Sequence, residues 1–84
     1  MYYVYLLKSL KDKGYYIGYS SDLKIRFIQH ADGEVKATKN RRPIEVIYYE
    51  AYNFKELAQE RERQLKNFGS AYTGLLKRLR LKLK

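Results

Sequence analysis

Two aromatic-rich segments lie close together at the start of this sequence, at residues Tyr2–Lys8 and Tyr15–Tyr19. Aromatic and β-branched residues favour strands because their side chains pack well on a pleated surface. The short polar stretch Ser9–Gly14 separates the segments, and strands joined by so short a connection pair antiparallel. The sequence therefore predicts a β-hairpin as the starting unit of the fold.

The segment after the hairpin predicts a short helix followed by a basic loop. Ser20–Asp22 offers residues that cap a helix N-terminus, and we expect the helix over about Leu23–Ala31. Asp32 and Gly33 are typical of a helix end. Several Lys and Arg side chains then lie in a loop that ends at Pro43.

The second half of the chain predicts one more strand and two more helices. Ile44–Ala51 is rich in Ile, Val and Tyr, as strands are. Asn53–Glu56 resembles a capping box that opens a helix running to about Phe68, with Gly69 as its stop. Ser70 can cap a last helix. We therefore expect an α/β (α+β) fold in the order β-β-α-β-α-α, with a small three-stranded, at least partly antiparallel sheet flanked by helices.

Chain length and residue types limit what this fold can be. With 84 residues there is room for one core, so we expect a single domain over residues 1–84. The chain has no cysteine, which excludes disulfides and thiolate zinc sites. It has no apolar run of about 18 residues, and its start lacks the basic-then-apolar order of a signal peptide. We expect a cytoplasmic protein without stable membrane association.

The charge balance indicates a polyanionic partner. Lys and Arg number 18 against 9 Asp and Glu, which gives a formal net charge of +9. Such a chain repels itself unless a polyanion neutralises it, and ten tyrosines are interleaved with the basic residues. We therefore expect a nucleic acid as the partner. The alternative is that the positive charge serves only solubility.

Two tyrosines of the predicted hairpin are candidates for a shared site. Residues two apart on a strand lie on one face, so Tyr5 shares a face with Leu7, and Tyr16 shares one with Gly18. One hairpin register brings Tyr5 and Tyr16 together, whereas a slip of one residue places them on opposite faces. The alternative is that both are half-buried tyrosines of the core.

Arg26 and His30 are spaced four residues apart, on one stripe of the first predicted helix beside Leu23 and Phe27. Both side chains are expected to lean toward the sheet. An arginine there can bind a phosphate through two donors, and a histidine can transfer protons near neutral pH. The alternative is a surface arginine and a histidine that make ordinary hydrogen bonds.

Glu62 is the carboxylate of the second predicted helix that is best placed to face the sheet. At 100° per residue it lies at the edge of an apolar stripe, whereas Glu56 and Glu60 point away from that stripe. Arg61 lies closer still to the stripe, so a structural Arg61–Glu62 ion pair is the alternative to a functional role. The residues expected to form the stripe are Phe54, Leu57, Ala58, Leu65 and Phe68.

Taken together, these segments resemble the GIY-YIG nuclease family, in particular its small stand-alone members. Tyr3-Val4-Tyr5 stands where the family has its Gly-Ile-Tyr motif, with Tyr3 in place of glycine, and Tyr16-Ile17-Gly18 is the Tyr-Ile-Gly motif intact. The later blocks that resemble the family are Asp22-Leu23 with Arg26 and His30, Thr38-Lys39 before Arg41-Arg42-Pro43, and Arg61 through Lys66. Asn67 comes too early to stand for the late active-site asparagine of many members.

The resemblance implies a role for each matching residue. Tyr5 and Tyr16 would flank the scissile phosphate, Arg26 would hold it, and His30 would assist proton transfer. Glu62 would bind a single divalent ion, Mg²⁺ or Mn²⁺, which neutralises charge on a phosphoryl oxygen. The residues expected to contact the nucleic acid are Lys36, Thr38, Lys39, Arg41, Arg42 and Lys66.

The function implied is a metal-dependent endonuclease that hydrolyses a DNA phosphodiester, in repair or recombination. We expect it to act on nucleic-acid structure, because no separate DNA-reading module fits in the chain; a protein partner could supply targeting, and RNA stays open as a substrate. The first alternative is a non-catalytic nucleic-acid-binding module with the same fold. The second is membrane-surface binding by the alternating Leu and cationic residues of Leu79–Lys84.

Overall fold

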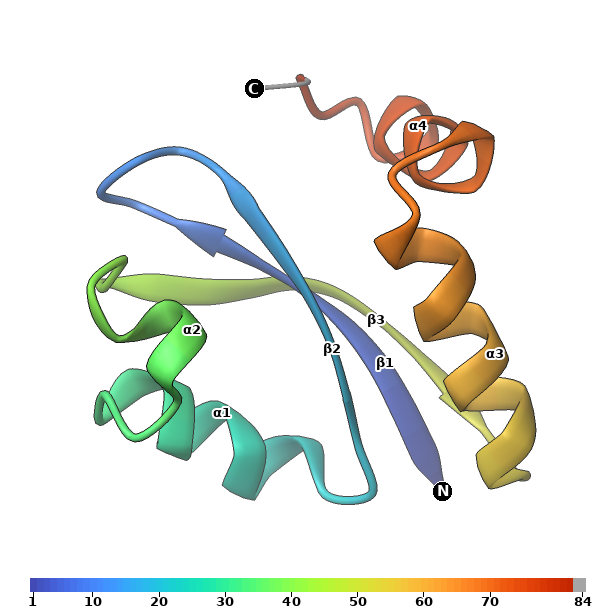
Figure 1. Ribbon diagram of the computed structural model, residues 1–84, viewed down its shortest axis with the longest axis horizontal. Coiled ribbons are helices and arrows are strands. Elements are labelled where there is room, and N and C mark those ends of the chain that lie inside the picture. The colour runs from blue at the N-terminus through green and yellow to red at the C-terminus, as the bar shows by residue number, and fades with distance from the viewer. Residues whose placement is uncertain (83–84) are drawn as a thin grey trace.

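The computed structural model describes residues 1–82 and contains an antiparallel sheet and helices in both halves of the chain (Figure 1). Its strands are β1 (Tyr2–Ser9), β2 (Tyr15–Ser20) and β3 (Ile44–Tyr52), and its helices are α1 (Leu23–Ala31), α2 (Lys36–Lys39), α3 (Lys55–Lys66) and α4 (Ser70–Arg78). The predicted fold class and order are confirmed. The one addition is α2, a single helical turn within the segment expected to be a loop.

The sheet is three-stranded, with β1 between β2 and β3 and both pairings antiparallel. Since β1 has neighbours on both sides, its middle residues are the most deeply buried of the sheet. In the β1–β2 register Tyr5 is opposite Gly18 and Leu7 is opposite Tyr16. Because opposed residues share a face, Tyr5 and Tyr16 lie on the same side of the sheet.

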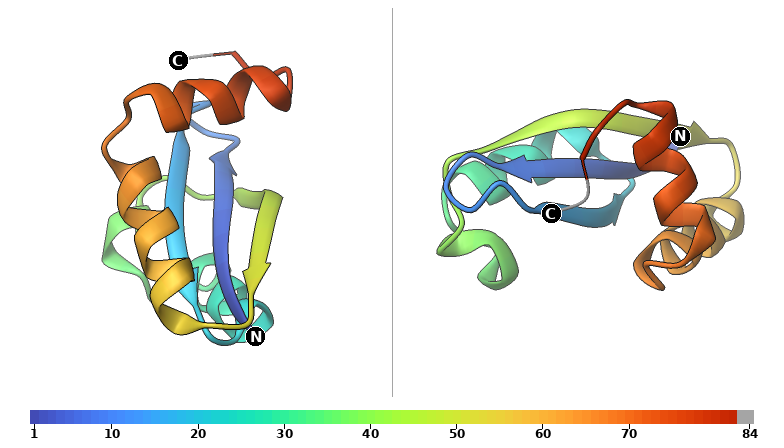
Figure 2. Two further views of the ribbon diagram at one scale, coloured as in Figure 1. Left: turned by 90° about the vertical axis from the view of Figure 1, so that its right-hand side faces the viewer. Right: turned by 90° about the horizontal axis from the view of Figure 1, so that it is seen from above.

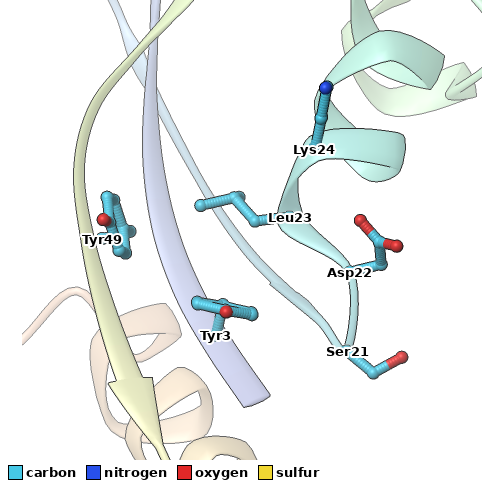
Figure 3. A pocket seen from close by; sticks show the side chains of 6 residues that line it. All are labelled: Tyr3, Ser21, Asp22, Leu23, Lys24 and Tyr49. Carbon is cyan, nitrogen blue, oxygen red and sulfur yellow. The ribbon is translucent and has the colours of Figure 1, made fainter. Parts of the chain in front are cut away.

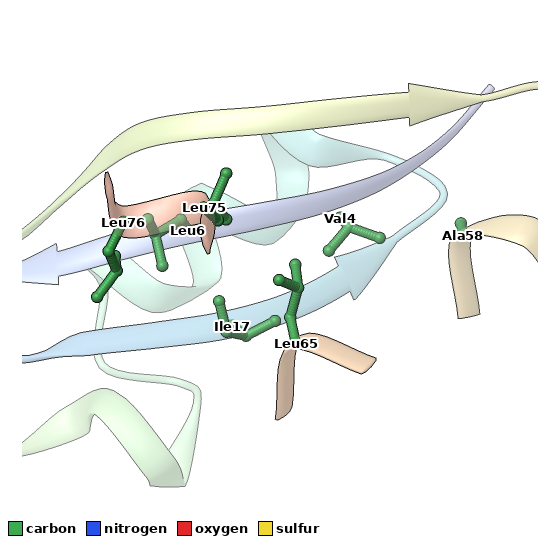
Figure 4. Packing of buried hydrophobic residues seen from close by; sticks show 7 residues of the cluster. All are labelled: Val4, Leu6, Ile17, Ala58, Leu65, Leu75 and Leu76. Atoms are coloured by element: carbon green, nitrogen blue, oxygen red, sulfur yellow. The ribbon is translucent and has the colours of Figure 1, made fainter. Parts of the chain in front are cut away.

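Alternation along β1 divides the interior into two parts. Val4 and Leu6 pack with buried residues of α3 and α4, whereas Tyr5 is bonded to His30 of α1. Figures 1 and 2 show α3 and α4 on one side of the sheet and α1 on the other. The first face holds the main apolar core, in which strands and helices meet (Figure 4). The buried residues of that core are Val4, Leu6, Ile17, Ala58, Leu65, Leu75 and Leu76.

Helix α1 has the bounds that its capping residues predict. The side chain of Asp22 accepts a hydrogen bond from the backbone N–H of Ile25 at 3.1 Å, which satisfies a donor that the first helical turn leaves free. At the other end, Gly33 has φ of +80° in the left-handed region that glycine adopts without steric cost. The helix therefore begins and ends where local sequence dictates.

Helix α3 is shorter than predicted, and only part of the predicted apolar stripe is buried. Phe54 precedes it without a side-chain capping bond, so the predicted capping box does not form. Phe54, Leu57 and Phe68 are all exposed by more than half, while Ala58 and Leu65 are buried. The face between Ala58 and Leu65 carries Arg61 and Glu62, which lie partly buried against the sheet.

An ion pair joins α3 to β3. Arg61 donates to both carboxylate oxygens of Glu50, through Nε at 3.0 Å and a terminal nitrogen at 3.0 Å. Tyr48 and Tyr52 donate to the same carboxylate. Burial alone would raise the pKa of Glu50, but the hydrogen bonds from Arg61, Tyr48 and Tyr52 outweigh it and leave that pKa below its ordinary value. The Arg61–Glu62 pair proposed from the sequence is therefore wrong.

The residues after α4 pack on the protein itself. Leu79 and Leu81 are partly buried against the apolar core, and Tyr15 on β2 donates to the backbone carbonyl of Lys82 at 2.9 Å. This packing contradicts the membrane-surface interpretation for 79–82, and Leu83 and Lys84 lie outside the described residues. Among residues 1–82, no helix has the length and apolar character that crossing a membrane requires.

Candidate active site

Tyr5 lies at the centre of the candidate site. Its side chain extends from the central strand across β2 and is 2% exposed. The ring rests on Gly18: a Cβ at residue 18 would lie 2.1 Å from Cζ and 2.2 Å from the phenolic oxygen of Tyr5. Only a residue without a side chain leaves room for the ring. The glycine of Tyr16-Ile17-Gly18 therefore positions the tyrosine of the neighbouring strand.

His30 of α1 connects Tyr5 to α2. Its ring is completely buried, with Nε2 2.8 Å from the phenolic oxygen of Tyr5 and Nδ1 2.7 Å from Oγ1 of Thr38. Its edge also contacts the ring of Tyr16, with 5.3 Å between centroids. A hydrogen-bonded chain thus runs from the sheet through His30 to Thr38.

The protonation of this chain follows from its burial. Burial, and then the positive charge of Arg26, lower the pKa of His30 from 6.5 to about 4, so the ring is neutral at pH 7. In a neutral imidazole one nitrogen donates and the other accepts. When the Tyr5 hydroxyl donates to Nε2, the proton of His30 sits on Nδ1 and is donated to Thr38. The two hydrogen bonds are therefore coupled through the tautomer of His30.

Charged groups surround the Tyr5 phenol. Burial raises the pKa of Tyr5, while the guanidinium of Arg26 opposes that rise through a hydrogen bond and its charge. The charges of Tyr16 and Glu62 add to the rise. Because burial dominates, Tyr5 keeps its proton at neutral pH in the free protein. The pKa of Tyr5 therefore depends on Arg26, Tyr16 and Glu62, and its hydroxyl is bonded to His30. The side chains that the sequence proposed for the site thus lie around one phenol.

Arg26 lies at the solvent-accessible edge of the cluster around Tyr5. It is partly buried, and one terminal nitrogen donates to Oε1 of Gln29 at 3.0 Å. With Gln29 it lines an open hollow of about 410 Å³ beside the β2–α1 connection. A ligand in that hollow can therefore reach the guanidinium.

Glu62 and Lys66 approach from α3 at the β2 edge of the sheet. Nζ of Lys66 lies 3.0 Å from Oε2 of Glu62 and 6.0 Å from the centroid of the Tyr16 ring. The Glu62 side chain is 22% exposed and that of Lys66 is 47% exposed. The carboxylate is therefore held near Tyr16 with a cation that faces solvent.

This arrangement can be compared with known proteins. The sequence profile described as the GIY-YIG catalytic domain matches residues 1–75. The chain belongs to the GIY-YIG family. The GIY-YIG domain is a nuclease domain, so its substrates are nucleic acids, and nucleases of this family generally depend on a divalent metal.

Small GIY-YIG relatives cover most of the chain. A UPF0213 protein of Staphylococcus saprophyticus is 40% identical over 68 residues, which are 80% of this chain and 82% of the relative. A UPF0213 protein of Natronomonas pharaonis is 35% identical over 71 residues, which are 83% of this chain and 82% of the relative. The solution NMR structure of a UPF0213 protein from Bacillus halodurans is similar with a TM-score of 0.57, at 33% identity, covering 94% of this chain and 85% of that one.

The GIY-YIG structure separates the basic residues proposed for nucleic-acid contact into two groups. Lys36, Lys39 and Arg42 are exposed. Arg41 is instead partly buried, with Nε 2.8 Å from Oδ2 of Asp12, and so joins the β1–β2 turn to the segment before β3. We correct the interpretation of Thr38: it is 1% exposed and bonded to His30, so its hydroxyl does not face a phosphate.

Sequence reasoning missed two contributions to the GIY-YIG site. The steric role of Gly18 was not anticipated, although the small residue between strand-forming neighbours marks a position where another group approaches closely. The contact between Thr38 and His30 was missed because nothing local indicates that a threonine eight residues away reaches the ring.

The donor set permits a divalent ion only with help from the substrate. Among residues 1–82 no group of three or more His, Cys, Asp or Glu side chains converges to hold a metal. Glu62 supplies one carboxylate. Mg²⁺ often binds through one or two carboxylates, with waters and substrate phosphates completing its octahedral shell. The residues thus fit a single ion that is bound jointly with a phosphate.

Proposed function

We propose that this GIY-YIG chain is a metal-dependent endonuclease that hydrolyses a DNA phosphodiester bond, with Tyr5, Tyr16, Arg26, His30 and Glu62 at its active site. The observation that carries the proposal is the buried Tyr5–His30–Thr38 chain, with Arg26 beside it. A purely structural core has no need of a buried phenol and imidazole beside a partly buried guanidinium, since burying polar groups is costly.

Proton transfer is the role that this geometry supports for Tyr5 and His30. The phenolic oxygen takes a proton from the attacking water while its own proton passes to Nε2 of His30, so that the phenol stays neutral. In the free protein His30 is a weak base because it is buried beside Arg26. A phosphate bound to Arg26 neutralises that charge, which raises the pKa of His30. The base is therefore strengthened when substrate binds.

Arg26 and Glu62 act on the phosphate itself. The guanidinium of Arg26 donates to the non-bridging oxygens, on which negative charge increases in the transition state. Glu62 would hold the divalent ion, which supplies further neutralisation of that charge when it is bound. Thr38 orients the His30 ring and does not meet the substrate.

The second candidate, a non-catalytic nucleic-acid-binding module, is favoured by one observation. The Glu62 carboxylate is already paired with Lys66, and within residues 1–82 it belongs to no group of three or more His, Cys, Asp or Glu side chains that could hold a metal. Such a module would keep the exposed cations Lys36, Lys39 and Arg42 as its binding surface. A protein partner would deliver either activity to its target in repair or recombination.

Cleavage assays separate the endonuclease from the binding module. The substrates are branched, nicked, single-stranded and duplex DNA and RNA, each with and without Mg²⁺ or Mn²⁺. We expect metal-dependent cleavage of structured DNA that Tyr5→Phe abolishes. Tyr2→Phe is the matched control, because Tyr2 is on the same strand and, by alternation, on the α3 side. Binding without cleavage under every condition would establish the binding module instead, and cleavage that persists in Tyr5→Phe would remove Tyr5 from the mechanism.

A further inference from the structure

One part of the sheet face that carries Tyr5 is left open beside α1. A hollow of about 460 Å³ lies there, between the first turn of α1 and strands β1 and β3 (Figure 3). This volume is in the range of small-molecule sites. Its lining residues are Tyr3, Ser21, Asp22, Leu23, Lys24 and Tyr49.

Two tyrosines form the sheet side of this hollow. Tyr49 is 55% exposed, and the partly buried Tyr3 meets it edge to face, with 6.0 Å between ring centroids. Figure 3 shows both rings on the strands, with the Leu23 side chain extending toward them from α1. Each ring can therefore present a surface to a planar ligand, while Leu23 supplies an apolar wall.

The chemistry of the lining matches an unpaired nucleobase. Every base has a flat π-face that stacks on an aromatic ring, and sheets with exposed aromatic residues bind single-stranded nucleic acid in this way. Lys24 provides a cation for a backbone phosphate, and Ser21 offers a hydroxyl for a base edge. The formal charge of +9 on the chain favours a polyanion over an acidic or neutral apolar peptide.

The hollow lies close to the candidate active site. Tyr49 is directly opposite Tyr5 in the β1–β3 register, and Tyr3 precedes Tyr5 by two residues on the same face. Two residues of a strand span about 6.6 Å, and successive stacked bases of one nucleic-acid strand are about 3.4 Å apart. A base in the hollow would therefore belong to a nucleotide within a few positions of a phosphate at Arg26.

We propose that the Tyr3–Tyr49 hollow stacks an unpaired base of the nucleic acid and so selects substrates with single-stranded segments over continuous duplex. This inference rests on the proposed function for the identity of the polymer. It narrows the substrate class, since a fully paired duplex offers no free base to the hollow. Flaps, loops, gaps and single-stranded ends all do.

The test measures oligonucleotide binding by fluorescence anisotropy without divalent metal, so that no cleavage occurs. We expect Tyr49→Ala to weaken binding of a single-stranded oligonucleotide by roughly 5- to 150-fold, the range of one lost stacking contact. Binding of a blunt duplex should stay unchanged, and Tyr49→Phe should bind as wild type does. Phe54→Ala is the control, because Phe54 is 58% exposed just before α3 and outside this hollow.

Two further measurements make the result specific. An oligonucleotide with abasic sites should bind wild type and Tyr49→Ala equally, because it has no base to stack. The chain has no tryptophan, so Tyr49→Trp introduces a single reporter whose fluorescence should be quenched by the normal oligonucleotide and not by the abasic one. Equal affinities of Tyr49→Ala and wild type for the normal single strand would overturn the inference while the nuclease proposal stands. Failure to bind any nucleic acid would overturn both.

Discussion

The ring of Tyr5 occupies the space above Gly18, where a Cβ would lie 2.1 Å from Cζ. Gly18→Ala must therefore push the ring away from His30, and an overpacked core typically loses about 1 to 3 kcal/mol of stability. We expect that loss in urea unfolding, together with loss of nuclease activity. Gly74→Ala is the control: nothing lies within 4 Å of a Cβ there, and alanine in this helix should stabilise the protein by about 0.5 to 1 kcal/mol. A Gly18→Ala protein as stable as wild type would contradict the steric role.

The low pKa of His30 predicts a pH-dependent stability. The unfolded ring titrates near 6.5 and the folded ring near 4, so between these values the unfolded state binds the extra proton. This contribution to stability is complete above about pH 6.5 and is lost as the pH falls toward 4, at up to about 1.4 kcal/mol per pH unit.

Unfolding of His30→Gln across the same pH range isolates this effect. Glu50 also has a lowered pKa, so its contribution is lost only as the pH falls below its ordinary value of 4.5. Between pH 6.5 and 5 the wild-type protein should lose stability that the variant does not lose. Parallel curves for both proteins would show that His30 is not the titrating group.

Two carboxylates near α3 should respond differently to the same substitution. Glu62→Gln removes the proposed metal ligand but leaves behind only Lys66, which is 47% exposed, so stability should change by less than about 0.5 kcal/mol. Metal-dependent cleavage should be lost. Glu50→Gln weakens the contact with the partly buried Arg61 and should lower stability by about 1 to 3 kcal/mol.

Glu60→Gln, on the outer face of α3, is the control for both carboxylate variants, because its contact with Arg63 is exposed. The melting temperature and cleavage rate of Glu60→Gln should be close to those of wild type. If Glu62→Gln kept full activity, or if all three variants behaved alike, the assignment of the metal-binding carboxylate would be wrong.

Arg26→Ala should slow cleavage by about 10²- to 10³-fold, which is the usual cost of one lost donor to a transition-state oxyanion. Fold and most of the nucleic-acid affinity should remain, because the guanidinium is only partly buried, lines an open hollow and donates to Gln29 of the same helix. Single-turnover rates at saturating protein measure the chemical step. If Arg26→Ala cleaved at the wild-type rate, Arg26 would contribute only positive surface charge and not transition-state stabilisation.

Binding to duplex DNA should weaken steeply with salt. Each phosphate neutralised by a Lys or Arg side chain contributes about −0.9 to the slope of log affinity against log salt. Replacing the exposed Lys36, Lys39 or Arg42 by alanine removes about one phosphate contact. Each substitution should therefore make the slope shallower by about 0.9. Arg41→Ala should act on stability instead, since Arg41 is paired with Asp12. A salt-independent affinity would exclude phosphate contacts as the basis of binding.

The sequence by itself determined the features that depend on near neighbours. Alternating aromatic and β-branched residues specify β1 and β2, and the side chain of Asp22 together with the positive φ of Gly33 sets the bounds of α1. The spacing of Arg26 and His30 placed both on the inward side of that helix. These predictions succeed because capping bonds, pleat and helical period act over a few residues.

Only the tertiary structure decided which distant side chains meet. The register that places Tyr5 over Gly18 depends on how two whole strands pack, and a slip of one residue would have reversed the faces. The pairing of Arg61 with Glu50 likewise joins two residues on different elements, α3 and β3. Hydrophobic pattern predicted correctly that Ala58 and Leu65 lie inside, but it also placed Phe54 and Leu57 there, and both are exposed. The charged partner of Arg61 could not be read from the pattern, because Glu50 lies on another element.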